Sequence, residues 1–276
     1  MTADVTGPAP LRKNAVHSDG DLPQRGTDGG AAGRRPWRRG GWVPPQHGAW
    51  AMLLLPFVAG LLPAWGGRAA WLHLPMLVAW LAAYLFSYFA FLAVKTGRPG
   101  RVQPQLVVYG GVTAAAGLPV VALRPALLWL APAFAACLAV NAVAARHRAD
   151  RSLVNDVASV VQACLVAPAV TVVAQVPARG ATGAAVAVGL YLVGTVLFVK
   201  TMIRERGDRR YRTASIGYHL VATVAATVLS WWLAVPFALY ALRAAVLPGR
   251  PLSPKRVGLL EVAASALLLG ALALPR

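Results

Sequence analysis

The chain has 276 residues, of which 58% are hydrophobic and only 13% are charged. A soluble globular domain carries about a quarter charged residues, so this composition excludes an ordinary soluble protein. The net charge of +18 would suit a nucleic-acid-binding protein, but the basic residues flank apolar segments and no nucleic-acid-binding motif accompanies them. We therefore predict an integral membrane protein that binds no nucleic acid.

The first segment, residues 1–41, is rich in Gly, Pro, Arg and Asp and has no apolar periodicity. Such a composition is typical of disorder, and no short apolar core with a cleavage site follows the early charges, as a signal peptide would require. We expect a disordered basic cytoplasmic tail over residues 1–41 and a transmembrane helical domain over residues 42–276.

Nine apolar stretches follow, each close to the roughly 20 residues that a membrane-crossing helix needs. They are residues 49–65, 70–94, 105–123, 125–145, 153–175, 181–202, 214–231, 233–248 and 257–274. The seventh and eighth form one run that is too long for a single span, and we divide it at Trp231-Trp232. A single kinked helix over residues 214–248 is the alternative.

The basic residues give the expected orientation. Of the 27, 23 precede the first stretch or lie near the end of, or in the loop after, the second, fourth, sixth and eighth stretches; this count includes Lys200 and Arg243, which lie just inside the sixth and eighth. Lys and Arg in short loops stay on the cytoplasmic side and attract anionic lipid headgroups of the inner leaflet. The chain is therefore predicted to be an all-α, multi-pass bundle of the inner (cytoplasmic) membrane, with its N-terminus in the cytoplasm and its C-terminus on the far side.

Acidic residues outside the tail all map to the cytoplasmic side. They are Asp150, Asp156, Glu205, Asp208 and Glu261. Ionisable groups at membrane depth are costly, so each is a functional candidate. Two have structural alternatives, because Asp156 can complement the dipole at the start of its helix, and Glu261, early in the last stretch, can extend its side chain to the inner interface.

The densest polar segment runs from Lys200 to His219. If the helix over 181–202 continues, Thr201, Glu205, Asp208 and Arg212 share one face. Such interleaved charge can bind a phosphate or carboxylate headgroup. A solvated inner loop is the alternative.

Three segments carry a resemblance to a known family. Pro45-Gln46-His47-Gly48-Ala49-Trp50, Val199-Lys200-Thr201-Met202-Ile203-Arg204-Glu205-Arg206 and Ser215-Ile216-Gly217-Tyr218-His219 are similar to the YwiC-like family of bacterial membrane proteins. The resemblance covers roughly residues 42–245.

The expected helix and loop plan also resembles the UbiA superfamily of intramembrane prenyltransferases. In that superfamily the 2–3 and 6–7 loops carry Asp-rich motifs that hold Mg²⁺ and an isoprenoid diphosphate. Here residues 94–101 contain no carboxylate, and the 6–7 loop keeps only Glu205 and Asp208 as possible Mg²⁺ ligands. The resemblance implies a UbiA-like bundle, while this departure argues against standard magnesium-dependent prenyl transfer.

From these observations we predict a cytoplasm-facing polar cavity that binds an amphipathic isoprenoid or phosphorylated lipid, and we assign no catalytic residue. The candidate binding residues are His47, Trp50, Tyr88, Lys95, Arg98, Arg101, Asn155, Asp156, Lys200, Arg204, Glu205, Asp208, Tyr211, Arg212, Ser215 and His219. A small-solute transporter and a non-catalytic assembly subunit are the alternatives. Whether the chain is an enzyme, and its oligomeric state, stay open.

Overall fold

The computed structural model describes residues 41–44, 48–64, 67, 70–177 and 179–274. Within these residues the structure is all-α, with no β-strand. The α-helices are α1 (Gly48–Ala64), α2 (His73–Thr96), α3 (Gln103–Leu123), α4 (Ala131–Arg146), α5 (Leu153–Cys164), α6 (Val166–Ala174), α7 (Arg179–Ile203), α8 (Arg209–Leu229), α9 (Ala234–Val246) and α10 (Pro254–Leu272). Short 3₁₀ turns precede α2, α3, α4 and α9, at Ala70–Leu72, Pro99–Arg101, Pro125–Leu130 and Trp231–Leu233. The predicted tail lies outside the described residues.

The helix pattern agrees with the nine apolar stretches except at one place. Residues 153–175 form two helices, α5 and α6, which meet at Leu165. Pro168 has no backbone N–H to donate to the carbonyl of Cys164 four residues earlier, which weakens helix continuity at this point. The predicted division near Trp231 is confirmed, because Ser230 has an extended backbone (φ −166°, ψ 130°) between α8 and the next 3₁₀ turn.

Five helical segments among the described residues are long and apolar enough to cross a membrane. They are Ala70–Thr96, Gln103–Leu123, Pro125–Arg146, Leu153–Ala174 and Gly180–Ile203. Two shorter apolar helices, Trp50–Ala64 and Trp231–Val246, accompany them. Helices α8 and α10 are more polar, because each carries three or more charged residues. The lengths and compositions therefore indicate a multi-pass membrane protein.

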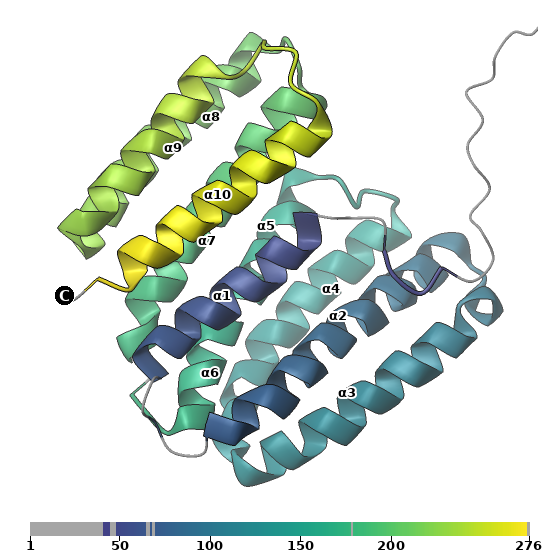
Figure 1. Ribbon diagram of the computed structural model, residues 1–276. Helices are drawn as coiled ribbons and strands as arrows, with labels where there is room; N and C mark the ends of the chain where they lie inside the picture. Colours follow the sequence, from purple (N-terminus) through teal and green to yellow (C-terminus); the bar gives the residue numbers. More distant parts are fainter. Residues whose placement is uncertain (1–40, 45–47, 65–66, 68–69, 178, 275–276) are drawn as a thin grey trace, which may run out of the picture. The chain divides into compact units, whose positions relative to one another are not determined.

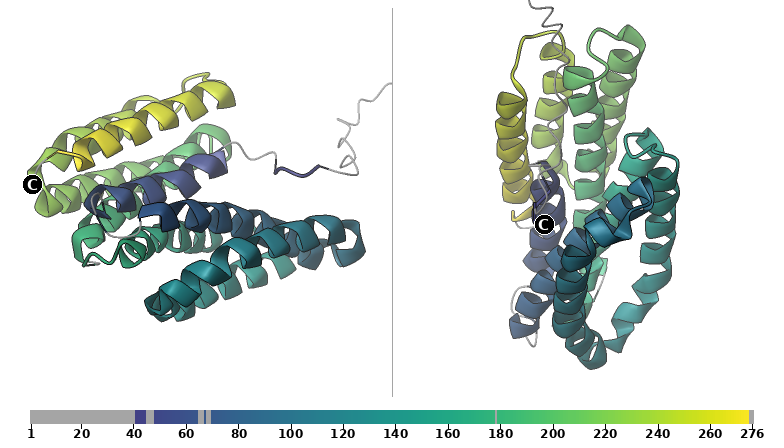
Figure 2. Two further views of the ribbon diagram at one scale, coloured as in Figure 1. Left: turned by 60° about the horizontal axis from the view of Figure 1, so that its bottom comes forward. Right: turned by 90° about the vertical axis from the view of Figure 1, so that its right-hand side faces the viewer.

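The helices form three groups (Figures 1 and 2). Helices α2, α3 and α4 pack together on one side, α8, α9 and α10 on the other, and α1, α5, α6 and α7 lie between them. The span formed by α5 and α6 is the most buried of the five, whereas α3 is largely exposed. An exposed apolar helix such as α3 suits a lipid environment.

Close packing at the centre depends on a glycine in α1. A Cβ atom at Gly60 would lie 2.7 Å from the backbone oxygen of Ala167 in α6. No real side chain tolerates that distance, so α1 and α6 approach each other only because Gly60 lacks one. Small residues commonly allow such close helix contacts in membranes.

We predict that Gly60→Ala destabilises the protein by about 1–3 kcal/mol, the usual cost of overpacking. The matched control is Gly111→Ala in α3, where an added Cβ meets no atom within 4 Å. Removing a helical glycine there stabilises by up to about 1 kcal/mol. Thermal unfolding of the purified variants measures both, and a Gly60→Ala protein as stable as Gly111→Ala would contradict the packing argument.

Candidate functional site

Contacts between loops bring the ends of several helices together. Lys95 at the end of α2 forms an ion pair with Asp150 in the α4–α5 loop. Lys200 near the end of α7 donates to the backbone oxygen of Arg151 in the same loop, at 3.0 Å. The loops predicted to face the cytoplasm after the second, fourth and sixth stretches therefore lie at one end of the bundle.

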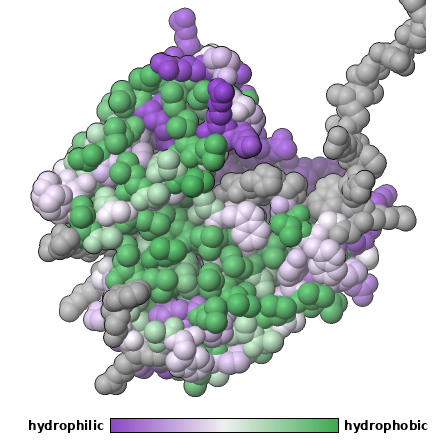
Figure 3. Space-filling view, in the orientation of Figure 1, coloured by the Kyte–Doolittle hydropathy of each residue, from purple (hydrophilic) through white to green (hydrophobic). Residues whose placement is uncertain are grey.

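The next pair of helices joins the same end. Arg212, early in α8, donates to the backbone oxygen of Ala245 near the end of α9, at 2.7 Å. Arg206 donates to the backbone oxygen of Arg250 in the α9–α10 loop, at 3.3 Å. Figure 3 shows hydrophilic surface along the upper and right-hand edge, where these helix ends lie, and hydrophobic surface over the flank. We call this end of the helices the polar end.

An open depression of about 390 Å³ lies at the polar end beside α2. It is lined by Lys95, Thr96, Arg98, Arg101 and Arg148, and we call it the basic depression. The three arginines form no salt bridge with any described acidic residue. Four cationic side chains and one hydroxyl thus surround a space large enough for a small anionic group.

A second polar region lies between α5, α7 and α8. The Lys200 ammonium lies 2.6 Å from the Asp156 carboxylate, and Lys200 is only 9% exposed. The Asn155 side chain donates to the backbone oxygen of Asp150 at 2.9 Å. Asn155, Asp156 and Lys200, all predicted as site residues, are therefore joined through the start of α5.

Of the two acidic residues predicted as site residues in the α7–α8 loop, Asp208 has a structural role. Asp208 accepts hydrogen bonds from the backbone nitrogens of Arg210 (2.8 Å) and Tyr211 (3.1 Å) and caps α8. Helix α7 ends at Ile203, so the continued helix that would align Thr201, Glu205, Asp208 and Arg212 on one face does not form. The chain turns instead at Gly207, whose φ is +93°, a value that favours glycine.

Tyr211, Ser215 and His219 lie at successive i, i+4 positions of α8 and therefore share one face. The Tyr211 hydroxyl, the Ser215 hydroxyl and His219 Nε2 are buried and have no hydrogen-bond partner among the described residues. Burial raises the pKa of the Tyr211 phenol, and the charges of Glu205 and Asp156 add to the rise. The phenol is thus a neutral hydrogen-bond donor at physiological pH.

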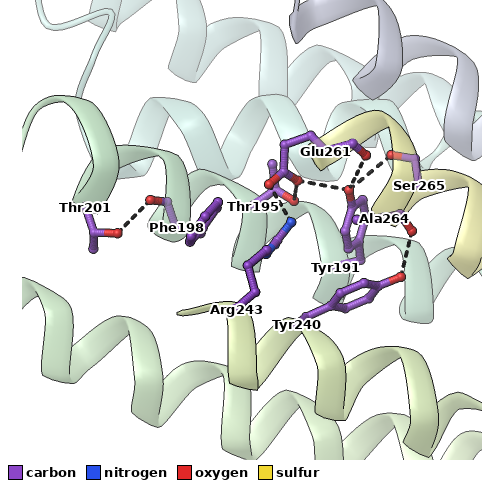
Figure 4. A network of polar contacts seen from close by, with 9 residues as sticks. All are labelled: Tyr191, Thr195, Phe198, Thr201, Tyr240, Arg243, Glu261, Ala264 and Ser265. Atoms are coloured by element: carbon purple, nitrogen blue, oxygen red, sulfur yellow. Dashed lines mark hydrogen bonds and ion pairs between the residues drawn. The ribbon is translucent and has the colours of Figure 1, made fainter. Parts of the chain in front are cut away.

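A buried ion pair joins α7, α9 and α10 (Figure 4). The Glu261 carboxylate lies 2.5 Å from the Arg243 guanidinium, and their side chains are 12% and 9% exposed. The other carboxylate oxygen accepts from Thr195 at 2.8 Å and from Tyr191 at 3.0 Å. The Tyr191 hydroxyl also lies 3.1 Å from Ser265. Every oxygen of the buried carboxylate is thus satisfied.

The guanidinium of Arg243 has aromatic neighbours as well. Its carbon Cζ lies 4.3 Å from the centre of the Phe198 ring and 5.4 Å from that of Tyr240, within the range of a cation–π interaction. The expectation that Glu261 extends to the interface is therefore wrong, because its carboxylate finds a cation and two hydroxyl donors inside the bundle. Sequence reasoning missed Arg243 because it counted the residue as a loop charge.

The remaining candidates lie apart from these regions or outside the described residues. His47 is not described. Trp50 packs edge-on against Tyr84 at 6.2 Å between ring centres, and Tyr88 packs against Phe89 at 5.2 Å. Arg204 is exposed just after α7. The structure thus gathers most predicted residues at the polar end but divides them between the basic depression and the α5–α7–α8 region.

No group of three or more His, Cys, Asp and Glu side chains comes together in the described part of the chain. Asp208 already uses one oxygen as the cap of α8. A Mg²⁺ ion at Glu205 and Asp208 stays a prediction.

Comparison with known proteins gives consistent results. A family model described as YwiC-like protein matches residues 43–171. The "Uncharacterized protein YwiC" of Bacillus subtilis (strain 168) is 32% identical over 222 residues, which cover 80% of this chain and 92% of that protein. An "Uncharacterized protein" of Haemophilus influenzae is 30% identical over 227 residues, 81% of this chain and 94% of its own length. No solved structure matches the chain.

We predict that Glu261→Ala destabilises the protein by about 3–5 kcal/mol, because it leaves the buried Arg243 cation unpaired. Asp150→Asn is the matched control, since it removes the acid of the more exposed Lys95 pair, and such pairs contribute about 1 kcal/mol or less. Thermal unfolding measures both variants. Replacing both members, as Arg243→Met/Glu261→Met, should recover most of the loss; equal stabilities of Glu261→Ala and Asp150→Asn would contradict the prediction.

Proposed function

The chain belongs to the YwiC-like protein family, and on that premise we propose that it is a nine-span protein of the cytoplasmic membrane that binds an amphipathic, phosphorylated lipid. The lipid headgroup occupies the basic depression at the polar end. Its apolar chain lies along the outside of the bundle.

The observation that carries the proposal is the charge of the basic depression. Four cations and the Thr96 hydroxyl line it, and Arg98, Arg101 and Arg148 form no salt bridge with a described acid. Guanidinium groups bind phosphate through paired, charge-assisted hydrogen bonds. A phosphorylated headgroup supplies the negative charge that these three arginines lack, whereas Lys95 already has Asp150.

Exposed apolar residues near the ends of α2, α3 and α4, the helices from whose ends and loops the residues of the basic depression come, favour a lipid over a free phosphate compound. Val94 directly precedes Lys95 and is 50% exposed, Val107 in the second turn of α3 is 66% exposed, and Val143 near the end of α4 is 58% exposed. A ligand with a phosphorylated head and a hydrocarbon chain satisfies both the cations and these side chains.

The proposed orientation follows from the same charges. With nine spans and the basic loops in the cytoplasm, the depression faces the inner leaflet, where anionic lipids are attracted to clusters of Lys and Arg. We also propose a UbiA-like arrangement of the helices. We do not propose metal-dependent prenyl transfer, because Mg²⁺ requires oxygen ligands, usually carboxylates, and residues 94–101 contain no carboxylate.

The test is lipid mass spectrometry on the full chain purified in detergent. We predict that Arg98→Gln/Arg101→Gln lowers the amount of co-purified phosphorylated lipid by tenfold or more, since each charge-assisted hydrogen bond contributes about 1.5–3 kcal/mol. The content of neutral lipid should not change.

Lys255→Gln/Arg256→Gln is the matched control. It removes the same number of charges at the exposed start of α10, outside the basic depression, and it should retain the lipid. Equal loss in both double variants would mean that general charge attraction is measured, and no loss in either would refute a headgroup site in the depression.

A further inference from the structure

Arg148 has a backbone conformation that arginine rarely adopts. It follows α4 in the α4–α5 loop and has a φ of +56°, in the left-handed region. In this region the Cβ of an L-residue lies too close to the following carbonyl oxygen, so glycine is favoured. Gly97, which ends α2 with a φ of +64°, follows this rule. Arg148 departs from it.

The end of α4 requires the left-handed conformation at position 148. The backbone nitrogen of Arg148 donates to the oxygen of Ala145 at 3.1 Å, and that of Ala149 donates to the oxygen of Ala144 at 2.7 Å. These two bonds form a common closing turn of a helix, in which the residue at position 148 is left-handed and is usually glycine. Residues strained in this way are concentrated at functional sites.

The position of its side chain distinguishes Arg148 from the other strained residue. Gln175, which follows α6, has a φ of +58° but is not among the residues that line the basic depression. Arg148 lines the depression from the α4–α5 loop, whereas Arg98 and Arg101 line it from the α2–α3 loop. None of these three guanidinium groups forms a salt bridge with a described acidic residue. The α4–α5 loop thus contributes a third unpaired guanidinium.

Contacts on both sides of Arg148 hold the α4–α5 loop in place. The hydrogen-bonded end of α4 precedes it. After it, the Asp150 carboxylate pairs with Lys95, and the backbone oxygen of Asp150 accepts from the Asn155 side chain at 2.9 Å. The backbone that carries the Arg148 side chain is therefore already ordered before a ligand binds, which reduces the entropy lost on binding.

The number of unpaired charges indicates which kind of phosphate fits. Lys95 lines the depression but pairs with Asp150, so the unpaired charge comes from the three arginines. Residues 95–101 and 146–151 together contain six basic residues and one acidic residue. A phosphodiester carries one negative charge, whereas a phosphate monoester carries about 1.5 to 2 at neutral pH and has three acceptor oxygens. The monoester therefore matches three guanidinium groups better.

We propose that the basic depression selects lipids whose headgroup is a phosphate monoester, and that Arg148 is the residue that makes this selection. Arg98 and Arg101 bind either kind of phosphate. Arg148 adds a guanidinium group that is satisfied only by the additional charge and acceptor oxygen of the monoester, because guanidinium groups bind phosphate oxygens in pairs. This inference rests on the headgroup site proposed above and states which phosphate that site takes.

The test is a binding titration of the full chain purified in detergent, followed by native mass spectrometry. The probes are dioleoyl phosphatidate, a phosphate monoester, and dioleoyl phosphatidylglycerol, a phosphodiester with the same two chains. Glycerol 3-phosphate, a monoester without chains, is the third probe. Arg148→Gly is compared with Gln175→Gly, which releases the same left-handed conformation outside the depression. Thermal unfolding of both variants is measured in parallel.

We predict that the wild-type chain binds phosphatidate at least about tenfold more tightly than phosphatidylglycerol, because the loss of one charge-assisted hydrogen bond weakens binding by about tenfold or more. Arg148→Gly should lose most of this preference, and Gln175→Gly should keep it. The two glycine variants should unfold within about 3 °C of each other, since each releases a left-handed residue with an exposed side chain.

The outcomes that contradict the inference differ from those that contradict the headgroup site. Equal binding of the two lipids, with both lost in Arg98→Gln/Arg101→Gln, would keep the site and overturn the selection. A full preference for phosphatidate in Arg148→Gly would overturn the role of Arg148. Binding of glycerol 3-phosphate as tightly as phosphatidate would overturn the choice of a lipid. Binding of both lipids that is unchanged in Arg98→Gln/Arg101→Gln would refute the headgroup site itself.

Discussion

The ion pair between Arg243 and Glu261 constrains how the last helices pack. Neither charge can lie at this depth alone, because an isolated buried ion costs several kcal/mol. The two charged residues belong to α9 and α10. The hydroxyls of Thr195 and Tyr191, which also bind the carboxylate, belong to α7. All three helices must therefore be in register for the charges to be satisfied. The Tyr240 hydroxyl, which donates to the backbone oxygen of Ala264 at 2.7 Å, holds α9 and α10 in the same register.

Near the α4–α5 loop, the lysines are paired with acidic residues, whereas the arginines of the basic depression are not paired with any described acid. Lys200 is buried between its helices and has Asp156 beside it, and Lys95 has Asp150, so each lysine near the α4–α5 loop has an acid. The arginines of the basic depression have none among the described residues. Paired charges hold helix ends together, whereas unpaired cations at the surface remain available to an anion. This difference, rather than the total charge of +18, distinguishes the basic depression, which we propose as the headgroup site, from the general excess of basic residues in loops that flank membrane spans.

Much of the fold could be predicted because hydropathy along the chain reports helices directly when lipid is the solvent. The break at Ser230 was predictable from length alone. The division of α5 from α6 was not, because Pro168 in a uniformly apolar stretch reads equally well as a kink. The pairing of Arg243 with Glu261 was also hidden, since the two lie 18 positions apart and only the packing of α9 on α10 brings them together. Asp208 illustrates a third limit, because a carboxylate that caps a helix and one that binds a metal look the same in a sequence.

A headgroup site and a buried ion pair place opposite demands on the charges of the bundle. A headgroup site needs cations that stay exposed and uncompensated, so it belongs at the helix ends beside lipid, where α2, α3 and α4 meet. A buried ion pair needs side chains shielded from bulk water and from hydrocarbon, so the Arg243–Glu261 pair belongs between helices, where α7, α9 and α10 pack together. Lys200, which is only 9% exposed, follows the second rule and has Asp156 beside it. A metal-dependent diphosphate site would need carboxylates in the depression, because Mg²⁺ requires oxygen ligands. Since cations line the depression instead, it suits an anion that brings its own negative charge.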